Sequence, residues 1–172
     1  MLTFYFYCAK IVEAISKFQK GGAVMSERVK KAEALFKEGY NCCQAVFAAY
    51  ADLFGMDTET ALRVSAGLGG GCGRQRELCG AVSGAAMIIG LKFGATEGAD
   101  ADGKMLCYEK VREHSEEFKK VNPSIVCREL LGLGDQNESA RPDERNEQYY
   151  KKRPCVQIGI DSAEALEKVI FE

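Results

Sequence analysis

The strongest constraint on the fold is the spacing of apolar residues, which recur every three or four positions between cap and stop residues. Ser26 can cap a helix that ends at Gly39. Its apolar face consists of Val29, Ala32 and Phe36. No segment shows the convincing alternation of apolar and polar residues that a half-buried strand requires. The spacing therefore predicts an all-α fold.

Cap residues, prolines and glycines delimit the remaining helices. We expect them over residues 42–54, 58–67, 79–93, 101–121, 123–132 and 161–170. Gly80 and Gly84 lie about one helical turn apart, so another backbone can pack closely against that helix. Residues 135–154 are polar and contain two prolines, which predicts an exposed loop. The chain is thus expected to form a single-domain bundle of about six to seven helices, with a glycine-rich loop at residues 67–74.

The first 24 residues differ from the rest, and two interpretations of them stay open. Lys20-Gly21-Gly22 can be encoded by a bacterial ribosome-binding sequence, at about the usual distance before Met25. Translation would then begin at Met25, and the domain would cover residues 25–172. Alternatively, apolar residues at helical spacing within 11–18 form a genuine N-terminal helix.

Charge and hydropathy exclude two classes of partner. The formal net charge is −2, and the short run Lys151-Lys152-Arg153 is better explained as a solvated loop than as a nucleic-acid surface. The longest early apolar run, residues 2–9, is far shorter than the roughly 20 residues of a membrane span, so no membrane insertion is expected. It also lacks the features of a signal peptide. We therefore expect a cytoplasmic protein with reduced thiols.

Eight cysteines and a single histidine, His114, narrow the chemistry further. The scarcity of histidine argues against imidazole-rich metal sites and against a Ser-His-Asp or Cys-His hydrolase. The cysteine density is below that of a secreted disulfide scaffold. The chain contains no Cys-x-x-Cys motif, which argues against a thioredoxin-type site or covalent haem.

Three of the cysteines, Cys42, Cys79 and Cys127, lie in the first turns of expected helices. Unpaired backbone N–H groups and the helix dipole stabilise a thiolate there, and a thiolate is the form that binds metals and attacks disulfides. Cys155 follows Pro154 and completes a set of four candidate ligands or redox residues. The alternative is that each is a small core residue.

The other cysteines are weaker candidates. Cys43 and Cys107 are expected to pack in the core. Cys72, in the glycine loop, is an undecided auxiliary thiol. Backbone amides of the glycine loop can approach sulfur closely, so we include Gly71, Cys72 and Gly80 as possible cofactor-binding residues. A ligand pair of Cys107 and His114 is conceivable, but a solvated or capping role for the histidine is favoured.

Several motifs together resemble the C-GCAxxG-C-C family of redox-active bacterial proteins. They are Asn41-Cys42-Cys43-Gln44-Ala45-Val46, Gly69-Gly70-Gly71, Cys79-Gly80-Ala81-Val82-Ser83-Gly84, Cys127-Arg128-Glu129-Leu130-Leu131-Gly132 and Cys155. The resemblance implies that the four characteristic cysteines are Cys42, Cys79, Cys127 and Cys155. It also implies an electron-transfer role, because related domains occur beside haem domains, and a link to a transporter system, because such genes often lie nearby.

Three hypotheses follow for the four cysteines. They ligate an iron–sulfur cluster in an electron-transfer protein or oxidoreductase; or they form a cofactor-free thiol/disulfide pair system; or they hold a structural zinc ion in a helical interaction module. The redox partner is unknown, and self-association of the chain stays open.

Overall fold

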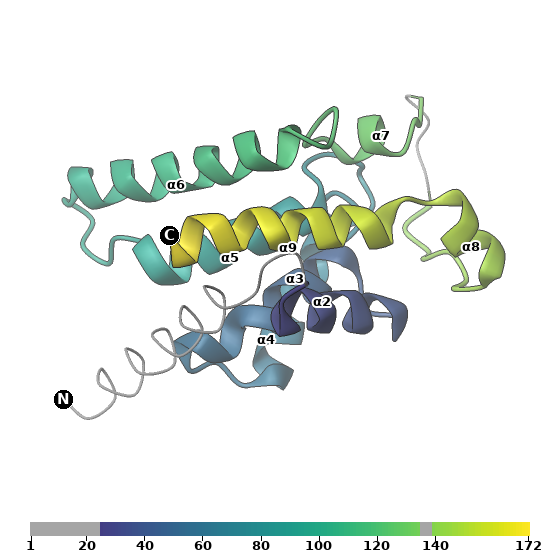
Figure 1. The fold of residues 1–172 in the computed structure, drawn as a ribbon, viewed down its shortest axis with the longest axis horizontal. Helices are drawn as coiled ribbons and strands as arrows, with labels where there is room; N and C mark the ends of the chain where they lie inside the picture. The colour runs from purple at the N-terminus through teal and green to yellow at the C-terminus, as the bar shows by residue number, and fades with distance from the viewer. Residues whose placement is uncertain (1–24, 135–138) are drawn as a thin grey trace.

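The computed structural model describes residues 25–134 and 139–172 and confirms the all-α prediction (Figure 1). The predicted N-terminal extension, residues 1–24, lies outside the described residues. Within them the chain forms eight α-helices, and extended pairing is limited to a single antiparallel bridge between Leu78 and Val126. The helices are α2 (Glu27–Lys37), α3 (Cys42–Tyr50), α4 (Thr58–Ser65), α5 (Gly80–Phe93), α6 (Ala101–Lys119), α7 (Cys127–Leu130), α8 (Glu147–Lys152) and α9 (Cys155–Phe171), with 3₁₀ turns at Ala51–Phe54 and Ala66–Leu68.

Local capping explains why α2 and α3 begin where the sequence predicts. The Ser26 side chain accepts a hydrogen bond from the backbone N–H of Val29 at the start of α2. Asn41 accepts from the N–H groups of Cys43 and Gln44, while the Gln44 side chain accepts from the Asn41 N–H, which is a complete capping box. These bonds satisfy backbone donors that a helix start otherwise leaves unpaired.

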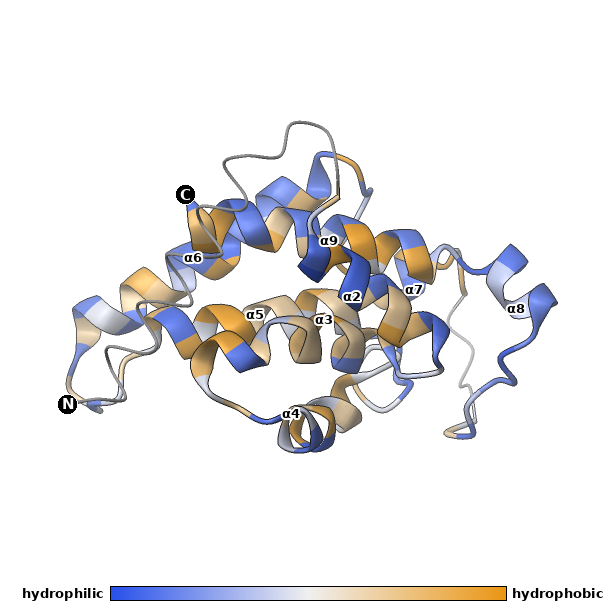
Figure 2. Cartoon of the chain, turned by 60° about the horizontal axis from the view of Figure 1, so that its bottom comes forward, coloured by the Kyte–Doolittle hydropathy of each residue, from blue (hydrophilic) through white to orange (hydrophobic). Residues whose placement is uncertain are grey.

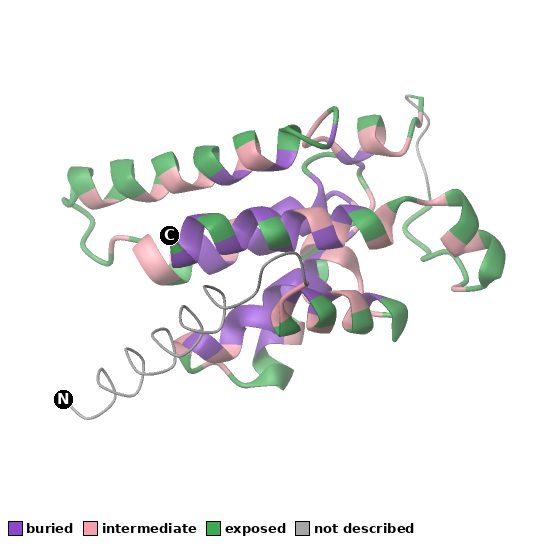
Figure 3. Cartoon of the chain, viewed as in Figure 1, coloured by how far each residue is buried: buried purple, intermediate pink, exposed green. Residues whose placement is uncertain are grey.

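Helices α3, α5 and α9 form the centre of the bundle. Helix α2 packs against α3 and α9, and α6 packs against α5 and α9, so the central helices are covered on several sides. Helix α5 carries no charged residue before Lys92, and Figure 2 shows it coloured as apolar along most of its length. Figure 3 shows the same gradient as burial, with α5 and α9 largely buried and the outer face of α6 exposed. No helix in the described ranges combines the length and apolar character needed to cross a membrane.

The predicted close approach to α5 is confirmed, and its partner is α3. A Cβ atom on Gly84 would lie 2.8 Å from the Cys43 carbonyl oxygen, and a Cβ on Gly80 would lie 2.5 Å from the Cys42 sulfur. Real Cβ atoms do not approach neighbours so closely, so both positions need glycine for α3 to pack at this distance. This packing brings the start of α3 beside the start of α5.

The C-terminal half departs from the prediction at three places. Helix α7 begins at Cys127 rather than at Asn122-Pro123, because residues 125–127 bond to the strand-like segment 77–79 instead: the N–H of Cys79 donates to the Ile125 carbonyl, and the N–H of Cys127 donates to that of Glu77. Helix α8 occupies part of the predicted loop. Helix α9 begins at Cys155, six positions before the expected capping residue Asp161.

Tertiary contacts explain the error at Asp161. Its carboxylate accepts hydrogen bonds from the side chains of Asn122, at 2.9 Å, and Gln157, at 2.8 Å, rather than capping a helix. The turn before it is helical because Ile158 and Ile160 are buried against the core. Packing of that apolar face therefore extends the helix back to Pro154, whose fixed backbone suits a helix start.

Candidate functional site

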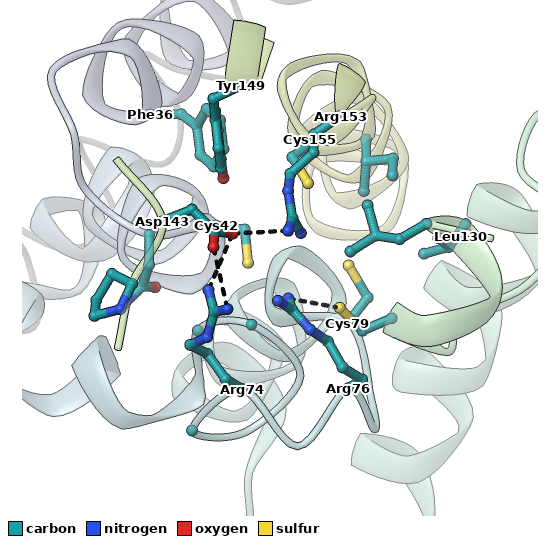
Figure 4. A pocket seen from close by; sticks show the side chains of 18 of the residues that line it. Phe36, Cys42, Arg74, Arg76, Cys79, Leu130, Asp143, Tyr149, Arg153 and Cys155 are labelled. Atoms are coloured by element: carbon teal, nitrogen blue, oxygen red, sulfur yellow. Dashed lines mark hydrogen bonds and ion pairs between the residues drawn. The ribbon is translucent and has the colours of Figure 1, made fainter. Parts of the chain in front are cut away.

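A cavity of about 340 Å³ lies at the end of the bundle where four helix starts converge. It is lined by Cys42, Cys79, Cys127 and Cys155, so the four cysteines that the sequence singles out face one space. Figure 4 shows the sulfur atoms of Cys42, Cys79 and Cys155 around it. The lining is completed by apolar residues such as Leu130 and by a set of arginines.

Each of the four cysteines stands at the start of a different helix. Cys42, Cys127 and Cys155 are the first residues of α3, α7 and α9, and Cys79 is the N-cap of α5. The sequence predicts a helix start at Cys42, Cys79 and Cys127 but not at Cys155. The backbone N–H groups of Ala81 and Val82 in the first turn of α5 lower the pKa of Cys79 against the larger effect of burial. The N–H groups of Cys43 and Cys127 are taken up by Asn41 and Glu77, and the single turn of α7 offers no extended dipole.

Burial opposes the thiolate stabilisation that we expected at the helix starts of Cys79 and Cys127. Burial raises the pKa of the Cys155 thiol to about 12 and raises the pKa values of Cys79 and Cys127 as well. A charge on Cys42 is a second cause for Cys79 and Cys155 and a smaller one for Cys127. The four sulfurs are thus close enough to repel one another as thiolates, and only a positive group can hold several of them ionised together.

Four arginines line the same cavity: Arg74, Arg76, Arg145 and Arg153. Arg76 lies deepest, with 6% of its surface exposed and its Nη1 atom 4.0 Å from the sulfur of Cys127. This contact lowers the pKa of Cys127 against the larger effect of burial. Arg153 likewise lowers the pKa of Cys155. The arginines supply positive charge where thiolate charge would form.

The outer part of the cavity contains a carboxylate shared by two arginines. Asp143 accepts from Arg74 at 3.2 Å and from Arg153 at 2.7 Å (Figure 4). Beside them, the guanidinium of Arg145 lies 4.3 Å from the ring centre of Phe36 and 4.6 Å from that of Tyr149. Arg145 also donates to the Tyr40 carbonyl oxygen, so it holds the segment before α8 against the loop between α2 and α3.

The glycine loop reaches the cavity through an unusual backbone conformation. Positive φ angles occur at Gly70, Gly71, Cys72, Gly73, Arg74 and Arg76. Residues other than glycine are strained at positive φ angles, and such strain often marks functional segments. Backbone bonds hold the loop in place, including one from the N–H of Arg128 to the carbonyl of Arg76 at 3.0 Å. The result places Arg74 and Arg76 on the cavity lining.

Gly71 and Gly80, predicted to bind a cofactor, do not line the cavity in this structure but make room for its cysteines. A Cβ on Gly71 would lie 2.8 Å from the Cβ of Cys127, just as one on Gly80 would meet the Cys42 sulfur. Cys72 is exposed and is not among the lining residues. These three residues are therefore not placed to contact a group inside the cavity.

The remaining candidates lie away from the cavity. Cys43 is fully buried in the core, as predicted, and Cys107 packs partly buried against it. Cys8 lies outside the described residues. The prediction that His114 is solvated or caps a helix is wrong: it is fully buried, with Nε2 3.1 Å from the Ser162 carbonyl oxygen. It is held there by the packing of α6 against α9.

The cysteines surround the cavity without clustering on one point. Among the described residues, no three histidine, cysteine, aspartate or glutamate side chains lie close enough together to hold a single metal ion. A zinc ion bound at roughly 2.3 Å by each sulfur would require the sulfurs to lie within about 5 Å of one another. A larger centre, such as a cluster, can be held by sulfurs spaced around a cavity.

Comparison with known proteins settles the family. The model of the family described as "Putative redox-active protein (C_GCAxxG_C_C)" matches residues 40–169, about three quarters of the chain. The chain belongs to this family. No curated protein and no solved structure matches the chain. In this C_GCAxxG_C_C protein, the matched region includes Cys79-Gly80-Ala81-Val82-Ser83-Gly84, where Cys79 lines the cavity and Gly80 and Gly84 admit α3.

The sequence does not predict the polar half of this family member's site. The run that contains Arg153 is expected to be a solvated loop, and no motif marks Arg74, Arg76, Asp143 or Arg145. The available signal was two arginines at alternate positions directly after a glycine run, in a loop with a single acidic residue, Glu77.

Proposed function

We propose that this protein is an electron-transfer protein in which Cys42, Cys79, Cys127 and Cys155 hold an iron–sulfur cluster. The observation that carries the proposal is the convergence of these four cysteines, from four helix starts, on one cavity of about 340 Å³. Such a cluster, when bound, supplies one-electron redox chemistry. Membership of a family named for redox activity is consistent with this role.

The residues around the cavity suit an anionic centre made of thiolates. Cysteine thiolates are the usual ligands of iron–sulfur clusters, and the chain has one histidine, buried elsewhere. Burial raises the pKa of the Cys79, Cys127 and Cys155 thiols, so bound iron would supply the positive charge that favours their ionisation. Arg76 adds a guanidinium beside Cys127, and the backbone N–H groups of Ala81 and Val82 act on Cys79. Hydrogen bonds and charges of this kind tune the potential of a cluster.

A second candidate is a cofactor-free disulfide between Cys42 and Cys79. The contact at Gly80 puts the Cys42 sulfur beside the first turn of α5, which Cys79 caps, and burial and then a charge on Cys42 are the two largest causes raising the pKa of Cys79. Oxidation would remove both thiol protons and two electrons, which a redox partner must accept. The structural zinc alternative requires the sulfurs to gather more closely than they do here.

One preparation separates the three candidates. The full chain is purified without oxygen, and iron, acid-labile sulfide, zinc, visible absorbance and free thiols are measured on the same sample. The proposal predicts iron and sulfide in equal amounts, with visible absorbance that bleaches on reduction. Zinc without absorbance would establish the structural site. A metal-free protein that loses two thiols on mild oxidation would establish the disulfide.

The setting of the protein is part of the proposal. We place it in the cytoplasm, where reduced thiols persist, because its cysteine density is below that of a secreted disulfide scaffold. Its partner would be a redox protein that reaches the cavity, in line with the proposed link to a transporter system. Enzymatic oxidoreductase activity and self-association stay predictions.

A further inference from the structure

Asp143 pairs with two arginines of the cavity, and a redox centre bound by the cysteines does not require this ion pair. Two nitrogens of Arg74 reach the two carboxylate oxygens of Asp143, at 3.2 and 3.4 Å, and Arg153 reaches one of them at 2.7 Å. The Arg74 and Arg153 side chains are only 17% and 20% exposed, whereas Asp143 is 40% exposed. The two guanidinium groups are thus mostly enclosed, and the acid lies nearer the solvent.

We propose that the mouth of this cavity is a binding site for a small oxyanion, which Arg74 and Arg153 hold in competition with Asp143. The planar guanidinium fork matches the oxygens of carboxylate, sulfate and phosphate groups, and Asp143 now occupies the place of such a group. The inference goes beyond electron transfer and does not depend on which chemistry the cysteines perform.

The four arginines that line the cavity make different contacts, which supports two subsites within it. Arg76 is almost fully buried and contacts Cys127, so its positive charge acts on the sulfur side of the cavity. Arg145 is engaged with aromatic rings and backbone carbonyls. Arg74 also donates to the Ser139 carbonyl oxygen, at 2.8 Å, and Arg153 lies 5.4 Å from the Tyr149 ring centre. They are nevertheless the two arginines that bond to the acid at the mouth. A cavity of about 340 Å³ is large enough to hold a small anion beside the cysteines.

Asp143 is suited to be displaced by a stronger anion. It lies outside any helix, between Ser139 and α8, and a partly exposed ion pair contributes little stability. The hydrogen bond from Arg74 is the largest cause that lowers its pKa, so it stays ionised and competes with other anions at neutral pH. A dianion such as sulfate offers the two arginines twice the charge of the carboxylate.

The test is titration calorimetry of the full chain with sodium sulfate, against sodium chloride at equal ionic strength. We expect saturable sulfate binding in the wild type. We expect the affinity to fall about tenfold in Arg153→Gln, because one charged hydrogen-bond partner is lost, and to rise several-fold in Asp143→Asn, because the competing charge is removed. Arg63→Gln, an exposed arginine paired with Glu59 on α4, is the matched control and should leave the affinity unchanged.

A gain of affinity in Asp143→Asn cannot arise from misfolding, so it protects the test against a damaged variant. Sulfate heats no different from those of chloride in both the wild type and Asp143→Asn would overturn the proposal. So would an equal affinity of the wild type and Arg153→Gln. Protein that binds sulfate but takes up no iron on anaerobic reconstitution would contradict the cluster and leave this inference standing. Iron-loaded protein that ignores sulfate would do the reverse.

Discussion

The sulfur of Cys42 lies where a side chain on Gly80 would have to go, since a Cβ built on Gly80 meets it at 2.5 Å. Gly80→Ala should therefore force α3 away from α5 and displace Cys42 from the cavity, with a destabilisation of about 1–3 kcal/mol from overpacking. Urea unfolding measures it. Gly90→Ala is the control: it lies on the same helix, a Cβ there meets nothing within 4 Å, and the change should be neutral or stabilise by up to ~1 kcal/mol. Equal effects of the two substitutions would contradict the close packing.

The glycine loop offers a second matched pair. Gly71 and Gly73 both have positive φ, at 71° and 58°, so alanine at either position should cost about 1–2 kcal/mol in backbone strain. A Cβ on Gly71 also meets the Cβ of Cys127 at 2.8 Å, whereas one on Gly73 meets nothing within 4 Å. Gly71→Ala should thus lower the free energy of unfolding more than Gly73→Ala. The Cβ on Gly71 would also lie 2.7 Å from the Glu77 backbone N, so an effect of equal size would contradict the close packing of Gly71 against this backbone and Cys127.

The burial of His114 predicts how the free energy of unfolding depends on pH. Burial lowers the pKa of His114 to about 4, below its usual value of 6.5. The unfolded chain therefore takes up a proton at this residue before the folded protein does, and stability present above pH 6.5 is lost as the pH falls from 6.5 toward 4. Between pH 7.5 and 5.5 the free energy of unfolding should fall by about 1 kcal/mol on this account.

His114→Leu isolates that contribution. The variant should lack this part of the pH dependence, whatever its stability at pH 7.5, because other titrating groups, such as the buried Glu167, are common to both proteins. Urea unfolding of both proteins at four pH values between 7.5 and 5.5 measures the difference. Parallel curves for the two proteins would contradict the buried, neutral histidine.

Capping made the first half of the fold predictable from sequence, because each cap is a local interaction. Asn41 selects the start of α3 through N–H groups two and three residues away. The start of α9 was not predictable in this way, since Asp161 is engaged by Asn122 from a distant segment. The same holds for Arg76, whose left-handed backbone is held by hydrogen bonds to Gly70 and to the distant Arg128. The cysteines were found because residue type alone marks them, whereas the arginines acquire their role only through the fold.

The contact of Arg76 with Cys127 predicts a change in thiol reactivity. Burial raises the pKa of Cys127 and the Arg76 guanidinium lowers it, so Arg76→Gln should raise it further. In metal-free protein, alkylation of Cys127 by iodoacetamide should then require a higher pH, because the thiolate is the reactive form. Mass spectrometry of the Cys127 peptide measures the rate. Arg63→Gln should not change the profile, and an unchanged profile in Arg76→Gln as well would remove Arg76 from the site.

The most direct test of a single four-cysteine centre is the iron content per chain in a series of cysteine variants. All are prepared alike, without oxygen. The account predicts that serine at Cys42, Cys79, Cys127 or Cys155 lowers bound iron severely, whereas Cys72→Ser, in the exposed loop, and Cys107→Ser, on α6, keep the wild-type content. Wild-type iron in any of the first four variants, or a wild-type protein that binds none after anaerobic reconstitution, would contradict it.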